Sequence, residues 1–155
     1  MAALWATIGD HDPTDFLARV QGLTAELPAG NAIALFEFAS ANDSTGHGEQ
    51  AAPLYRQALA AGLTGERRRR AVIQLASTLR NLGKAEESVA LLTAEREAGS
   101  DELDDAVAAF LALALVDTGR EREAAALALA ALSRHLPRYN RSLANYAKAL
   151  SDGPG

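Results

Sequence analysis

Four consecutive arginines, Arg67 to Arg70, form the most concentrated charge in this 155-residue sequence. They stand at the start of a predicted helix, where the positive end of the helix dipole disfavours cations. A guanidinium can hold a carboxylate through two parallel hydrogen bonds, so the run could bind an anionic group of a partner. Alternatively it is a solvated helix start whose arginines pair with Glu66, Asp43 or Glu49, or with acids further along the chain. Four consecutive positions cover every face of a helix, so at least two of these arginines must be structural or solvent-facing.

The densest acidic stretch is explained by a helix start. Four carboxylates are grouped in "SDELDDAV": Asp101, Glu102, Asp104 and Asp105. Their spacing lacks the pattern and the glycine turn of a calcium loop. Acids at the start of a helix are expected from the dipole alone, with Ser100 as the predicted N-cap.

The sequence offers no convergent set of catalytic residues. It contains no cysteine, which excludes disulfides, thiol chemistry and thiolate zinc sites. Its histidines, His11, His47 and His135, have no paired spacing on one helix. There is no phosphate loop, dinucleotide fingerprint or nucleophile elbow. We therefore predict no catalytic residue, no metal and no cofactor.

The charge balance restricts the partners. The net charge is −5, which argues against a whole-surface attraction to nucleic acid or anionic lipid. The start, "MAALWATIGDHDP", is apolar but too short to cross a bilayer. We predict a cytoplasmic protein without a nucleic-acid or membrane partner. Residues 1–12 are expected to be loose or docked, and Trp5 is a candidate self-association surface.

The elements that carry these residues are predicted to be helices. Strand alternation is nearly absent, and Ala and Leu dominate the apolar residues. Asp12-Pro13 reads as an N-cap followed by a first-turn proline. Gly22, inside the first long helix, either admits a close neighbour or is merely tolerated. The expected helices span 13–27, 33–43, 49–61, 67–82, 85–98, 101–118, 121–136 and 139–150.

Three turn glycines reveal an internal repeat. Gly46, Gly83 and Gly119 are separated by 37 and 36 residues. Seven residues before each glycine stands a small residue: Ala39, Ala76 and Ala112. Eight residues before each glycine stands a large residue: Phe38, Leu75 and Leu111. Five residues after each glycine stands a small residue: Ala51, Ser88 and Ala124. Eight residues after each glycine stands a leucine: Leu54, Leu91 and Leu127. The twelfth place after each glycine holds Ala58, Glu95 and Ala131, with the glutamate as the exception. A helical pair with this pattern cannot bury its apolar stripe alone, whereas stacked pairs cover one another.

This pattern resembles the tetratricopeptide repeat family, whose signature is Trp-x2-Leu-Gly-x2-Tyr, then Ala-x3-Phe, then Pro, at a period of about 34 residues. The second repeat gives the match Val72-x2-Leu75-Ala76-x2-Leu79, then Ser88-x3-Leu92. The resemblance covers about residues 31–136. The chain departs from the signature in its longer period, its missing Trp and Pro, and its alanine in place of the packing glycine. More narrowly, the chain is similar to small stand-alone bacterial members without an assigned activity.

The resemblance implies an all-α, right-handed tetratricopeptide-like helical solenoid with three helix pairs plus N- and C-terminal capping helices. We expect a single domain over 13–150, with repeats at about 31–63, 66–100 and 101–136, a capping helix at 139–150 and a tail at 151–155. A plain antiparallel bundle is the alternative, but it gives no reason for three matched registers.

The resemblance also implies that the first helix of each pair lines a concave groove. On the helix that starts with the arginines, a polar ladder lies opposite the apolar stripe: Arg70, Gln74, Ser77 and Asn81, with Arg80 at its edge. The equivalent helix of the first repeat contributes Phe36, Glu37, Ser40 and Asp43. The third repeat contributes Ala109, Phe110, Leu113 and Asp117.

From these residues we predict a non-catalytic interaction module that binds a peptide or protein segment in the groove. Arg70, together with Arg80, would hold an anionic group. Gln74, Ser77 and Asn81 would satisfy a bound backbone, and Phe36 and Phe110 would offer apolar contact. Two alternatives remain at the level of the sequence: a structural homo-oligomer, such as a homodimer, and a regulatory domain of a larger signalling or transcription system.

Overall fold

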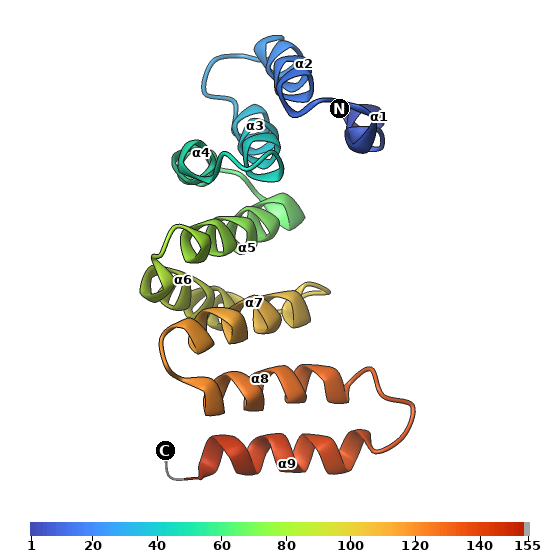
Figure 1. The fold of residues 1–155 in the computed structure, drawn as a ribbon, viewed down its shortest axis with the longest axis vertical. Coiled ribbons are helices and arrows are strands. Elements are labelled where there is room, and N and C mark those ends of the chain that lie inside the picture. The colour runs from blue at the N-terminus through green and yellow to red at the C-terminus, as the bar shows by residue number, and fades with distance from the viewer. Residues whose placement is uncertain (154–155) are drawn as a thin grey trace. The chain divides into compact units, whose positions relative to one another are not determined.

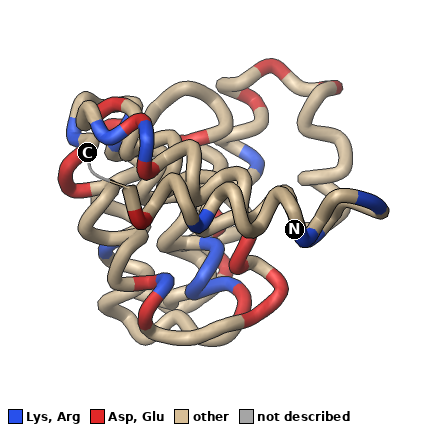
Figure 2. Tube along the Cα trace, turned by 90° about the horizontal axis from the view of Figure 1, so that it is seen from below, with Lys and Arg blue, Asp and Glu red and all other residues tan. Residues whose placement is uncertain are grey.

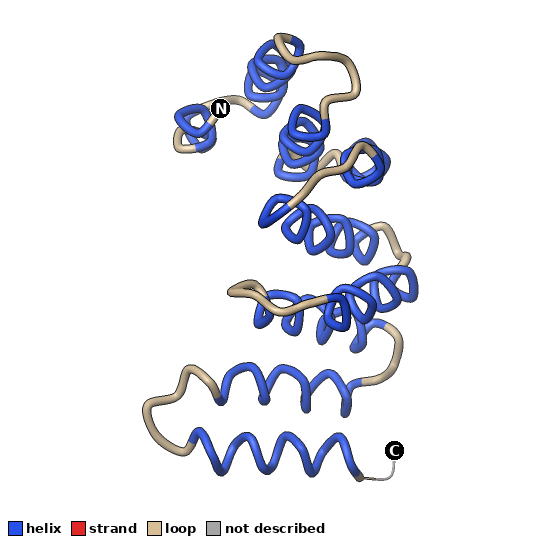
Figure 3. Tube along the Cα trace, turned by 180° about the vertical axis from the view of Figure 1, so that it is seen from behind, coloured by secondary structure: helices blue, strands red, loops and turns tan. Residues whose placement is uncertain are grey.

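A computed structural model describes residues 1–153 of the protein, and all of its long elements are helices. In chain order they are α1 (Ala2–Trp5), the 3-10 helix η1 (Ile8–Asp10), α2 (Pro13–Ala25), α3 (Ala32–Ser44), α4 (Gly48–Ala60), α5 (Gly65–Asn81), α6 (Ala85–Ala98), α7 (Asp104–Asp117), α8 (Glu121–Ser133) and α9 (Asn140–Asp152) (Figure 1). No strand occurs within the described residues (Figure 3). The prediction of an all-α chain is confirmed.

Two helix ends differ by three residues from the sequence prediction, whereas the others agree with it within two residues. The helix expected from 101 begins at Asp104, because the Asp101 carboxylate accepts the amide of Leu103 at 2.7 Å and holds a turn there. Ser100 is not the N-cap, since its hydroxyl donates to the Asp104 carboxylate. The helix expected to reach 136 ends at Ser133.

The C-terminal end of the chain also differs slightly from expectation. Pro137 disfavours helical backbone at Leu136, which explains part of the early end of α8. α9 runs to Asp152, so the predicted tail at 151–155 begins inside a helix. The last two positions of that tail lie outside the described residues.

The three turn glycines have the same conformation. Gly46, Gly83 and Gly119 have φ angles of +83°, +75° and +75°, a region that glycine adopts without the strain other residues incur. The residue after each glycine donates its amide to the carbonyl five positions earlier, at 2.8, 2.9 and 2.9 Å. The repeat inferred from spacing is therefore a repeat of backbone geometry.

The small residues that define the repeat are buried in each copy. The small residues before the glycines, Ala39, Ala76 and Ala112, are all in the core. The small residues after them, Ala51, Ser88 and Ala124, are buried as well. Even the exceptional Glu95 is buried, at the position held elsewhere by alanine. Small side chains here allow the two helices of a pair to approach closely.

Contacts divide the chain into two compact units, Met1–Thr78 and Leu79–Gly155. In the first unit, α2 packs on α3 and α3 packs on α4. Its largest fully buried side chains include Tyr55, Phe16 and Phe36. In the second unit, α6 packs on α7, α7 on α8 and α8 on α9. There the core is mainly aliphatic, with Leu92 and Leu115 among its largest members.

The N-terminal segment packs against the first unit. Phe16, Val20 and Ala41 form a buried cluster that is partly covered by Met1, Leu4, Trp5, Ile8, Leu17 and Phe38. The Trp5 ring meets the Phe16 ring edge-on with centroids 5.1 Å apart. The Trp5 indole N–H donates to the Glu37 carboxylate at 2.7 Å. Trp5 is therefore engaged within its own chain.

Over the helix predicted for 13–27, the apolar side chains are buried only in the first half. Phe16 and Val20 are in the core, whereas Leu23 and Leu27 are exposed. The cap is as predicted, since the Asp12 carboxylate accepts the amide of Thr14 at 2.9 Å. Among residues 1–153, no helix is long and apolar enough to cross a membrane.

Candidate partner-binding surface

A hydrogen-bonded polar network joins α3, α4 and α5 in the first unit. The Tyr55 hydroxyl donates to Ser40 and to the Asp43 carboxylate, both at 3.4 Å. The Thr78 hydroxyl donates to Asp43 at 3.0 Å. Ser40 in turn donates to the side-chain oxygen of Gln74 at 3.4 Å. These hydrogen bonds hold α3, α4 and α5 together through polar rather than apolar side chains.

Burial shifts the titration of two members of this network. The pKa of Asp43 is raised because desolvation disfavours its charged form, although the hydrogen bonds from Thr78 and Tyr55 oppose that effect. Burial also raises the pKa of the Tyr55 phenol well above its ordinary value. At neutral pH, Tyr55 is therefore a hydrogen-bond donor and Asp43 is a partly buried acid.

The arginine run divides into residues with different surroundings. Arg69 is only 6% exposed, so it belongs to the interior. Arg70 keeps 49% of its side chain exposed and lies 3.8 Å from the Glu66 carboxylate one helical turn earlier. Its guanidinium carbon also sits 5.6 Å from the centroid of the Phe36 ring, within the range of a cation–π contact. The predicted pairing of an arginine with Glu66 is thus observed, and Arg70 remains partly available to solvent.

The other ladder residues of α5 differ in accessibility. Gln74 and Ser77 are half-buried, and Asn81 is exposed. On α3, Phe36 is 2% exposed and Ser40 is also buried, so both are packed rather than open. Phe36 supports Arg70 from beneath instead of presenting its own ring.

In the second unit, the candidate residues lie near the end of α5 and along α7. Arg80 forms an ion pair with Asp117, with Nε and Oδ2 2.6 Å apart. Phe110 is half-buried on α7. Two further apolar side chains on α7 are exposed, Leu113 at 46% and Val116 at 48%.

The sequence interpretation included Leu113 but missed Val116. Val116 lies three residues after Leu113, a spacing that places both on one helix face. That periodicity was a usable signal for Val116. No sequence pattern pointed to the Tyr55–Asp43–Thr78 contacts, because they depend on how three helices meet.

Asp105 in the second unit pairs with two basic side chains near the end of α8. The Asp105 carboxylate is paired with Arg134 and lies 2.6 Å from His135 Nε2. The Arg134 hydrogen bond, followed by that of His135, lowers the pKa of Asp105. No group of three or more His, Asp or Glu residues that could hold a metal ion occurs in the described part of the chain. Basic and acidic positions are interspersed along the backbone (Figure 2).

These observations define a class of protein, an all-α repeat protein built from helix–turn–helix units. The profile of the family described as Tetratrico peptide repeat matches residues 32–150. The chain belongs to the tetratricopeptide repeat family, and the prediction of a tetratricopeptide-like helical solenoid is confirmed. The match starts at the first residue of α3 and extends into α9, beyond the 31–136 range covered by the residue pattern.

No curated protein and no solved structure matches the chain in the corresponding searches. Members of the tetratricopeptide repeat family generally act as non-catalytic modules that mediate protein–protein interaction.

Proposed function

We propose that this chain is a non-catalytic module that binds a protein or peptide segment on the exposed faces of its first helices, α3, α5 and α7. The class of activity is proposed from the family, and the binding surface is proposed from the exposed residues of this chain. The proposal includes a concave groove as the family's usual location for the partner and the cytoplasm as the compartment.

The observation that carries the proposal is the exposed apolar face of α7. Leu113 and Val116 expose nearly half of their surfaces, and Phe110 precedes them on the same helix. Adjacent exposed apolar side chains favour burial by a partner. We therefore propose that the bound segment presents apolar side chains to Leu113 and Val116.

A second observation concerns the first unit. Arg70 is held by Phe36 and Glu66 yet keeps half of its side chain exposed. Its ion pair with Glu66 is long, at 3.8 Å, so guanidinium N–H groups remain for a carboxylate of the partner. This supports the proposed role of Arg70 as the anion-binding residue.

The apolar surface is tested by replacing Leu113 with glutamine. Because Leu113 is exposed, Leu113→Gln should leave the melting temperature nearly unchanged, within the small effects typical of surface substitutions. Native lysate captured on the purified protein, analysed by mass spectrometry, should lose the partner seen with the wild type. Leu132→Gln is the matched control, since Leu132 is 48% exposed on α8 rather than on a first helix. Equal capture by Leu113→Gln and the wild type would contradict the proposed surface.

Arg70 and Asn81 are tested in the same way with alanine substitutions. Reduced capture at an unchanged melting temperature would support their binding role. A lower melting temperature with unchanged capture would assign them to the fold instead. Turnover by the purified wild-type protein in a broad substrate screen, abolished by one polar substitution, would overturn the non-catalytic part of the proposal.

A further inference from the structure

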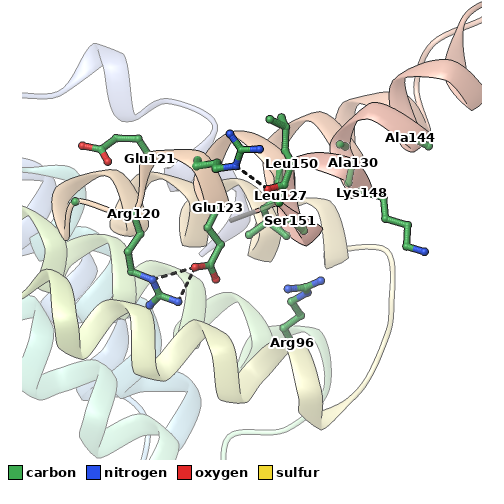
Figure 4. A pocket seen from close by; sticks show the side chains of 15 residues that line it. Arg96, Arg120, Glu121, Glu123, Leu127, Ala130, Ala144, Lys148, Leu150 and Ser151 are labelled. Atoms are coloured by element: carbon green, nitrogen blue, oxygen red, sulfur yellow. Dashed lines mark hydrogen bonds and ion pairs between the residues drawn. The ribbon is translucent and has the colours of Figure 1, made fainter. Parts of the chain in front are cut away.

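A cavity of about 750 Å³ lies in the second unit, away from the first-helix surface of α7. Its lining comes from the turn before α8, most of the length of α8 and α9, and Arg96 near the end of α6 (Figure 4). The volume falls within the range of roughly 300–1,000 Å³ typical of small-molecule sites. The cavity is therefore large enough for an organic ligand.

The lining of this cavity is positively charged, although the chain as a whole carries −5. Four cations line it, Arg96, Arg120, Arg122 and Lys148, against two carboxylates, Glu121 and Glu123. Glu123 is already neutralised by Arg120, which donates two hydrogen bonds to it at 2.7 and 3.0 Å. Three cations thus face one uncompensated carboxylate.

Arg122 is fixed in position by the end of α9. Its Nε donates to the carbonyl of Leu150 at 3.0 Å, an arrangement that also suits the negative end of the α9 dipole. Gly153 admits the guanidinium, since a Cβ at that position would lie 2.6 Å from Arg122 Nη2. The terminal nitrogens of Arg122 make no other hydrogen bond within the described residues, so they remain available to a ligand.

Arg96 and Lys148 are two exposed cations of the cavity that have no carboxylate partner among the described residues. Arg96 points from α6 toward α8 and α9, and Lys148 extends from α9 on the same side (Figure 4). An anion between them would accept charge-assisted hydrogen bonds from both side chains, in the role that a carboxylate has in an ion pair.

The remaining wall of the cavity is apolar and built from small residues. Ala126 and Ala130 on α8 face Ala144 and Ala147 on α9, with Leu127 beside them. Alanines keep the backbones close while leaving space that larger side chains would fill. A ligand here would meet cations on one side and hydrocarbon on the other.

We propose that this cavity binds a small organic anion, with one or two phosphate or carboxylate groups toward Arg96, Arg122 and Lys148 and an apolar body against the alanines. The site is independent of the proposed partner surface, because α8 and α9 are not first helices of a pair. A small-molecule ligand at this site would be additional to the protein partner expected for the repeat family.

Calorimetric titration of the full-length protein with naphthyl phosphate tests the site. We expect saturable one-to-one binding, no comparable binding of uncharged naphthol, and weaker binding of inorganic phosphate. Arg96→Gln with Lys148→Gln should weaken the binding of naphthyl phosphate about a hundredfold, since each substitution removes a hydrogen bond to a charged group that is worth about tenfold in affinity. Both residues are exposed, so the melting temperature should hold.

The matched control is Arg138→Gln with Arg141→Gln, which removes the same net charge from exposed positions that do not line the cavity. Amide shifts on titration should concentrate at Gly119, Ala126 and Ala144. Absence of saturable binding, equal weakening in the control pair, equal binding of naphthol, or shifts located elsewhere would each overturn the proposal.

Discussion

Asp43 shows how one residue's surroundings determine its energetic role. Its carboxylate receives hydroxyl hydrogen bonds from Thr78 and Tyr55, but burial outweighs them and raises its pKa. The folded state therefore binds this proton more tightly than the unfolded chain does. Stability is consequently lost as the pH rises through the folded pKa of Asp43.

We predict that Asp43→Asn stabilises the protein at neutral pH. Asparagine keeps an oxygen that can accept from Thr78 and Tyr55, and it removes the cost of burying a charge. The difference in unfolding free energy between variant and wild type should shrink as the pH falls toward 3.8, the ordinary pKa of an aspartate carboxyl. Urea unfolding over a series of pH values measures it.

Asp117→Asn is the control, because its exposed carboxylate is paired with Arg80 and should give no gain. A loss of stability in Asp43→Asn that is the same at every pH would show that the carboxylate serves as an acceptor whose charge costs nothing.

Residue types alone did not define the accessibility of the candidate surface. The helical wheel placed Phe36 and Ser40 on the face shared with Arg70, but the structure buries both. A wheel describes one helix, whereas exposure depends on the helices packed beside it. The burial of Glu95 has the same explanation. Its charge makes it an exception to the repeat pattern in the sequence, yet the structure buries it at the position where the other repeats have alanine.

At the scale of the element, the sequence predicted the helices well because their signals are local. Gly83 and Gly119 mark helix ends through a backbone conformation that needs no distant contact. The failures were also local. At the start of α7, the Asp101 side chain competes for an amide, and periodicity does not record such competition.

We predict that alanine at the turn glycines and alanine in α2 act in opposite directions. Nothing lies within 4 Å of a Cβ built at Gly83, Gly119 or Gly22, so the effects come from the backbone alone. Gly83→Ala and Gly119→Ala should each lower the unfolding free energy by about 1–2 kcal/mol, because their φ is positive. Gly22→Ala should raise it by roughly 0.5–1 kcal/mol, because that glycine is inside a helix.

Thermal and urea unfolding of the three variants measure these changes. Gly22→Ala is an internal control, because it adds the same methyl group to a helical backbone. A loss of stability in Gly22→Ala would mean that a neighbouring group occupies the space around Gly22. An unchanged unfolding free energy in Gly83→Ala would contradict the turn geometry that Gly83 shares with Gly119.

At the scale of the whole molecule, the open question is whether the apolar start of the chain serves the fold or an assembly. Sequence reasoning left both alternatives, since an exposed tryptophan among apolar residues favours burial by any neighbour. The structure covers part of Trp5 with Phe16 and satisfies its N–H with Glu37. This chain therefore uses its N-terminal segment to cover the end of the first unit, as terminal caps do in repeat proteins.

We predict that Trp5→Ala lowers the unfolding free energy by about 1–3 kcal/mol, less than the 3–5 kcal/mol typical of a fully buried aromatic, because Trp5 is only half-buried. Trp5→Phe should lose less, since it keeps the ring contact with Phe16 and gives up only the hydrogen bond to Glu37. Neither variant should change the molar mass measured by light scattering across a dilution series. A lower molar mass for Trp5→Ala at an unchanged melting temperature would instead place Trp5 in an interface between copies of the chain. A residue whose contacts lie within one chain should change the stability before it changes the assembly.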